Sequence, residues 1–142
     1  MKVVDAHVLL YAVNRDATAH EPSRAWLDGA LSAAEPVGFA WIVLTAFLRL
    51  STHPGIHPAP LTPEAAIDVA QAWLAQPPAV IVTPSPGHLG SLRSMLHATG
   101  SGGNLVNDAH LAALALDYGA TVVTYDNDFG RFPGVGWERP TA

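Results

Sequence analysis

The feature that most constrains the fold is the alternation of short β-branched runs with longer helix-like segments along the 142 residues. The strand candidates are KVVD at 2–5, VGFA at 37–40, AVIV at 79–82, ATVVTYD at 120–126 and a short run near 136–138. Because helical segments separate them, the strands are expected to run in the same direction. The order predicts an α/β sandwich, with a mainly parallel sheet covered by helices on both faces.

Local end signals mark several of the predicted helices. Thr62 followed by Pro63 is a helix start, because Thr is a good N-cap and Pro suits the first helical position. Thr18 with Glu21 three residues later has capping-box spacing and predicts another helix start. Gly119 predicts the end of the last long helix.

Composition excludes several classes of protein. The chain has no cysteine, which excludes a disulfide framework, a thiolate nucleophile and Cys-ligated zinc. Its net charge of −5 gives no general attraction to nucleic acid, so such a role must come from a site. The first apolar stretch is interrupted by Asp5 and His7, and is too short and polar for a signal peptide or a membrane span. We expect one cytoplasmic domain over 1–142, without a membrane partner.

Four aspartates are predicted to gather at one edge of the sheet. Asp5 ends the first strand and Asp126 follows the TVVT run, and ligands bind parallel sheets at the carboxyl ends of the strands. Asp128 follows Asp126, and Asp108 lies in the first turn of a late helix. Clustered carboxylates repel one another unless they are protonated or bridged by cations. Aspartate oxygens suit Mg²⁺ or Mn²⁺ better than zinc, so the joint pattern predicts a divalent-metal site.

Each acid taken alone also has a structural explanation. Asp5 could be a helix N-cap, and Asp126 with Asp128 could form a polar turn after a strand. Asp108 could interact favourably with the dipole of its own helix. Only the convergence of three separate segments on one edge favours a site.

Two long segments, VVDAHVLLYAVN and NLVNDAHLAALALDYGATVVTYDNDF, resemble the PIN domain of VapC-type toxins, the metal-dependent ribonucleases of toxin–antitoxin pairs. The segments AFLRLSTHP, GNLVNDAHLAALA and DFGRFPGVGW are similar to one branch of these toxins. The resemblance covers nearly the whole chain. It implies a three-layer α/β/α fold, Mg²⁺ or Mn²⁺ at the site, endoribonuclease activity on RNA, a homodimer and a cognate antitoxin.

The family pattern also implies roles for particular residues. Asp5 matches the first acid of the family, Asp108 the acid at the head of the late helix, and Asp126 with Asp128 the pair after the last core strand. The resemblance makes these four the metal ligands and catalytic residues, and Thr124 matches the hydroxyl residue before the pair.

One position departs from the family pattern. Many PIN domains have a glutamate where this chain has Ala46, and the nearest oxygen is the hydroxyl of Thr45, a much weaker ligand. Four aspartates still supply enough oxygen for one ion. Whether a second ion binds stays open, as does the choice of Asp126 or Asp128 as general base.

The chemistry that we expect is hydrolysis of an RNA phosphodiester by water that the ion activates. Arg49 and Arg131 are candidates for contacting substrate phosphate. Arg49 could equally be an ordinary surface arginine, whereas the proximity of Arg131 to Asp128 in the sequence favours a functional role for it somewhat more. Trp41 or the apolar helix at 42–50 could form the dimer contact.

Two other functions compete with the nuclease. With Ala46 in place of the glutamate, the domain could be a catalytically silent module that binds RNA or a partner protein. A phosphotransfer domain ranks lowest, because Asp5-Ala6-His7 lacks the second acid of the phosphatase signature.

Overall fold

A parallel sheet forms the centre of the computed structural model, which describes residues 1–141. Its strands are β1 (Lys2–Val4), β2 (Val37–Ala40), β3 (Ala79–Val82), β4 (Thr121–Val123) and β5 (Trp137–Glu138). They lie in the order β3-β2-β1-β4-β5, and every neighbouring pair is parallel. The predicted sheet is confirmed, and β1 and β4 are adjacent strands near its middle.

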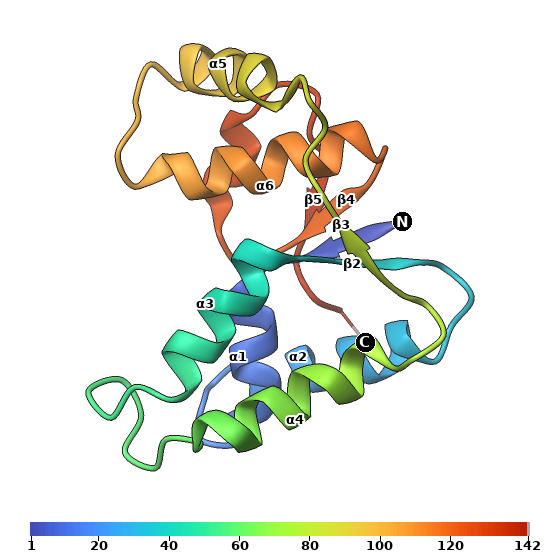
Figure 1. Cartoon of the computed structure of the whole chain (residues 1–142), viewed down its shortest axis with the longest axis vertical. Helices are drawn as coiled ribbons and strands as arrows, with labels where there is room; N and C mark the ends of the chain where they lie inside the picture. Colours follow the sequence, from blue (N-terminus) through green and yellow to red (C-terminus); the bar gives the residue numbers. More distant parts are fainter. Residues whose placement is uncertain (142) are drawn as a thin grey trace.

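Helices cover both faces of this sheet. They are α1 (Ala6–Val13), α2 (His20–Leu31), α3 (Trp41–Ser51), α4 (Pro63–Leu74), α5 (His88–Thr99) and α6 (Leu105–Asp117), with a 3₁₀ turn, η1, at Asn127–Arg131. Figure 1 shows α1 to α4 on one side of the sheet and α5 with α6 on the other, which gives three layers. Within residues 1–141 no helix combines the length and the apolar character needed to cross a membrane.

The core lies on both sides of β1 and β4. The valines of these strands, Val3, Val4, Val122 and Val123, are fully buried. Helix α6 is buried without interruption from Leu111 to Ala115, because it lies between the sheet and α5. Alanine at three of these positions brings the helix backbone close to the sheet. The helix that carries Asp108 is therefore held firmly in place.

Two of the predicted helix ends are confirmed. The Thr62 hydroxyl accepts a hydrogen bond from the backbone N–H of Ala65 at 3.1 Å, with Pro63 in the first turn of α4. Gly119 follows the end of α6 with φ 62°, a left-handed conformation that suits glycine.

The predicted capping box at Thr18 and Glu21 is wrong. Helix α2 begins at His20, and its N-cap position, Ala19, has no side-chain capping bond. The start is instead tied to α1, because the buried His20 places its Nδ1 atom 2.8 Å from the carbonyl oxygen of Tyr11. A tertiary contact thus replaces the local cap.

Candidate metal centre

Asp5 lies where β1 ends and α1 begins. Its backbone N–H donates to Val123 at 3.0 Å, so the pairing of β1 with β4 continues up to the acid. One carboxylate oxygen, Oδ1, caps α1 by accepting from the N–H of Ala6 at 2.8 Å. Asp5 is therefore a helix N-cap, as its structural explanation predicts. It also lies at the carboxyl end of β1, where the predicted metal site places it.

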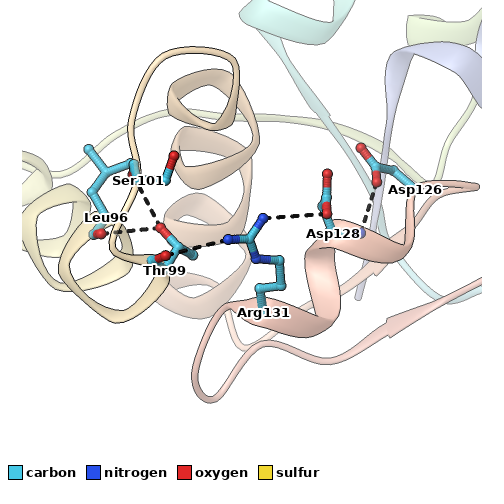
Figure 2. Close-up of polar contacts among 6 residues, drawn as sticks. All are labelled: Leu96, Thr99, Ser101, Asp126, Asp128 and Arg131. Carbon is cyan, nitrogen blue, oxygen red and sulfur yellow. Dashed lines mark hydrogen bonds and ion pairs between the residues drawn. The ribbon is translucent and has the colours of Figure 1, made fainter.

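The hydroxyl of Thr124 joins Asp5 to the acids that follow β4. This fully buried side chain donates to Asp5 Oδ2 at 2.7 Å and accepts from the N–H of Asp126 at 3.0 Å. Asp126 Oδ1 in turn accepts from the N–H of Asp128 at 2.8 Å, which caps η1 (Figure 2). One chain of hydrogen bonds thus orients three of the four predicted site acids.

Asp108 comes to the other acids from a separate element, α6. It lies in the first turn of α6, and one carboxylate oxygen from each of Asp108, Asp126 and Asp128 lies within 4.8 Å of the others. Asp5 is outside this group, and its two oxygens accept hydrogen bonds from Ala6 and Thr124. Three predicted ligands are therefore brought together, and a ligand role for Asp5 stays a prediction.

Burial and like charge together raise the pKa of Asp108 from 3.8 to about 7. Desolvation is the largest cause, followed by the charge of Asp126 and then that of Asp5. A hydrogen bond with the Asp126 side chain and the charge of Asp128 act in the same direction. Near neutral pH the metal-free site therefore has a carboxyl group that a cation would deprotonate.

Three of the four acids open onto a cleft of about 180 Å³, and Asp128 is not part of its lining. Its lining includes Asp5, Asp108, Asp126, Asn107, Ala46 and Arg49. Ala46 thus faces the site from the position where many PIN domains are expected to have an acid. The Thr45 hydroxyl donates to helix carbonyls of Trp41 and Ile42, and Thr45 does not line the cleft. Thr45 is therefore no substitute for the missing carboxylate.

The two candidate arginines have different surroundings. Arg49 lines the cleft and is exposed, and within residues 1–141 it forms no ion pair. Arg131 is the last residue of η1, and its side chain reaches toward the end of α5 (Figure 2), with Nη1 3.7 Å from Asp128 Oδ1 and Nη2 donating to the Thr99 carbonyl at 3.4 Å. Arg131 thus offsets part of the charge of a candidate ligand.

Residues beside the acids were missed by reasoning from the sequence. His7 lines the metal cleft, and it also lines a second groove together with Tyr11 and Tyr125. The available signal was the spacing of His7 and Tyr11, which puts both on one face of a helix directly after Asp5. Tyr125 could be added only from the pairing of β1 with β4.

Replacing Thr124 by valine is expected to lower Mn²⁺ affinity by about 10–100-fold, the range typical of groups that orient metal ligands. Valine has nearly the same volume but leaves Asp5 Oδ2 and the N–H of Asp126 without their shared partner. Calorimetric titration of Mn²⁺ into the variant measures the change. Thr124→Ser retains the hydroxyl and is the matched control; equal losses in both variants would exclude the hydrogen-bond explanation.

A pH dependence follows from the pKa of Asp108. Between about 4 and 7 the folded metal-free protein keeps a proton that the unfolded chain releases, so its free energy of unfolding falls as pH rises. Mn²⁺ affinity rises over the same interval, because the metal needs the carboxylate. Urea unfolding and Mn²⁺ titration over this pH interval measure the two trends, the falling free energy of unfolding and the rising Mn²⁺ affinity. In Asp108→Asn, the free energy of unfolding and the Mn²⁺ affinity should both depend less on pH. A pH dependence equal to that of the wild type would refute the assignment to Asp108.

Comparison with known proteins agrees with this geometry. The family model for the PIN domain matches residues 2–135. The chain belongs to the PIN-domain family. This PIN-domain chain is 58% identical over 142 residues to Ribonuclease VapC37 of Mycobacterium tuberculosis, with 100% of this chain and 99% of the relative covered. It is therefore a VapC-type PIN domain, as the resemblance implies.

Solved structures confirm the fold. Mycobacterium tuberculosis VapC20, described as a Sarcin-Ricin loop cleaving toxin, has a TM-score of 0.73 at 18% identity, with 99% of this chain and 100% of VapC20 covered. A chain of the DNA-bound VapBC2 complex of Rickettsia felis has a TM-score of 0.68 at 22% identity, with 97% of each chain covered. At such low identity the likeness establishes the α/β/α fold of this VapC-type domain.

Proposed function

We propose that this VapC-type domain is a toxin endoribonuclease that hydrolyses RNA phosphodiester bonds with Mg²⁺ or Mn²⁺ bound by its aspartates. The observation that carries the proposal is the group of Asp108, Asp126 and Asp128, two of which, Asp108 and Asp126, line the cleft. The ribonuclease name of a full-length relative at 58% identity supports the same activity.

The donor set fits a hard divalent ion. Its three members offer only carboxylate oxygens, the ligands that Mg²⁺ and Mn²⁺ prefer. An ion bound there would polarise a phosphate oxygen and lower the pKa of water. Asp5, fixed by Thr124, completes the negative wall, and Asp126 or Asp128 would accept the proton of the attacking water. Because Ala46 supplies no further acid, the proposal is for one ion.

Arg49 is the group that we assign to the RNA backbone. It lines the same cleft as Asp108, and its guanidinium is available to a phosphate beside the scissile bond. Arg131 already contacts Asp128 and Thr99, so we assign it first to balancing the negative charge of the acids. Its second role is to contact the RNA. With a net charge of −5, the domain would depend on such local cations for substrate binding.

The same proposal includes a cognate antitoxin and a homodimer in the cytoplasm. The acids form a negative cleft that a cationic antitoxin tail could fill in exchange for the metal. A basic peptide is thus expected to inhibit RNA cleavage, and unchanged activity would argue against this exchange. Trp41, 58% exposed at the start of α3, is the apolar side chain that we assign to the dimer contact.

The test is incubation of the purified chain with total cellular RNA in Mg²⁺, Mn²⁺ or EDTA, beside an Asp5→Asn variant. The proposal predicts discrete cuts that need metal and disappear in the variant. A folded protein that binds RNA but leaves it intact under every condition would favour the alternative, a silent RNA-binding module.

A further inference from the structure

A second groove lies directly beside the metal cleft. It has a volume of about 220 Å³, and its lining is Asp5, His7, Tyr11, Thr124, Tyr125 and Asp126. Asp5, His7 and Asp126 line both this groove and the metal cleft, so the two hollows adjoin at these residues. A ligand that binds at the two acids can therefore extend into either hollow.

Three aromatic rings form a row along the second groove. The ring centroids of His7 and Tyr11 are 5.7 Å apart, and those of Tyr11 and Tyr125 are 5.6 Å apart. His7 and Tyr11 lie one turn apart on α1, whereas Tyr125 comes from the segment after β4. The row therefore crosses from one element to another next to the proposed metal site.

The far end of the row is fixed before any ligand binds. The Tyr125 hydroxyl is 2.6 Å from Ser23 Oγ, a fully buried group on α2. The Arg139 guanidinium carbon lies 5.9 Å from the Tyr125 ring centroid, within cation–π range, and its Nη2 donates to Asn127 at 3.0 Å. The Tyr125 ring, held in this way, loses little conformational freedom when a ligand stacks on it.

The three rings of this row are more exposed than the aromatic side chains of the core. His7 is exposed and Tyr11 and Tyr125 are only half-buried, whereas the phenylalanines Phe39, Phe47 and Phe129 are fully buried. Among the described residues, the groove has no lysine or arginine in its lining and has two carboxylates at its edge. These surroundings disfavour a phosphate and favour an uncharged, flat group.

We propose that the row of His7, Tyr11 and Tyr125 is a subsite for a nucleobase of single-stranded RNA, next to the cleft in which a bound ion would hold the phosphate. The proposal rests on the proposed function, since RNA places an uncharged base beside each phosphate. Unpaired RNA bases are commonly bound by stacking on aromatic side chains, and one such contact contributes roughly tenfold or more to affinity. The groove thus selects unpaired RNA at the cleavage site.

The experiment measures binding of a short single-stranded RNA that contains 2-aminopurine, with Ca²⁺ as the divalent ion. Stacking on the row is expected to quench the fluorescence of the bound RNA. His7→Ala should weaken binding by roughly tenfold and remove part of the quenching, because stacking contributes affinity of that order. His7→Phe, which keeps a ring, should restore both. Because His7 is exposed, these substitutions leave the core intact.

Arg49→Ala is the matched control, because Arg49 lies in the metal cleft and does not line the aromatic groove. Arg49→Ala should weaken RNA binding and reduce the salt dependence of the RNA affinity, while leaving the quenching of bound RNA unchanged. The subsite is refuted if His7→Ala binds and quenches like the wild type, or if RNA does not bind the wild type at all. It is also refuted if a basic peptide binds the wild type and is weakened by His7→Ala, while RNA binding is not.

Cleavage in Mn²⁺ separates this inference from the proposed function. If RNA is cut but its fluorescence is not quenched, the proposed nuclease activity stands and the base subsite is refuted. RNA that is quenched on the row and never cut supports the subsite within a silent module.

Discussion

Replacing Asp108 by asparagine is expected to reduce RNA cleavage by more than about a hundredfold, since loss of groups that merely orient metal ligands already costs 10–100-fold. The substitution keeps the shape of the side chain but removes one of the three clustered carboxylates. Initial rates on a defined RNA in Mn²⁺, compared with Mn²⁺ affinity from calorimetry, measure the effect. Both quantities should fall together.

The stability of the same variant separates chemistry from folding. Above pH about 7 the wild-type side chain is charged in surroundings that disfavour its charge, and asparagine removes that cost. Metal-free Asp108→Asn should therefore melt no lower than the wild type, whereas Mn²⁺ should stabilise only the wild type strongly. Asp117→Asn, an exposed change on the same helix, is the control. Full activity in Asp108→Asn would remove this residue from the metal site.

The largest expected effect on stability is that of Phe129→Ala, roughly 3–5 kcal/mol, the range for deleting a buried phenylalanine side chain. Phe129 is fully buried in η1, and its ring centroid lies 5.9 Å from that of Phe132 in an edge-to-face contact. The same short turn contains Asp128, so the cavity also loosens a candidate ligand. Urea unfolding gives the loss of stability, and Mn²⁺ titration gives the loss of affinity.

Phe129→Leu is the matched control, because leucine refills part of the cavity and should lose clearly less stability. A loss below about 1 kcal/mol in Phe129→Ala, which is typical of surface substitutions, would show that η1 is not anchored by this ring.

Most of the architecture could be predicted because the local signals agree with one another. The β-branched runs around Val3 and Val122 are buried strands, and only a parallel arrangement is compatible with the helices between them. The N-cap at Thr62 could be predicted because Thr62 and its hydrogen-bond partner Ala65 lie within one helical turn. The cap predicted at Thr18 failed because contact with Tyr11 decides where α2 begins, and such a contact is invisible in local spacing.

The site was predictable to the extent that strand ends determine it. Adjacent parallel strands place Asp5 and Thr124 next to each other, and the order of the elements supports this placement. Three details depended on tertiary geometry: the separation of Asp5 from the group of three acids, the hydrogen bond from Arg131 to the Thr99 carbonyl, and the aromatic row. Each joins residues far apart in the chain or sets the orientation of a side chain.

Catalysis by one aspartate-bound ion is tested most directly by titrating Mn²⁺ into the metal-free protein and following bound Mn²⁺, by electron paramagnetic resonance, together with the rate of RNA cleavage. We expect the rate to rise in proportion to the occupancy of one site, and Asp108→Asn to lose occupancy and rate together. Cleavage that persists in EDTA, or a filled site with no cleavage, would contradict this mechanism.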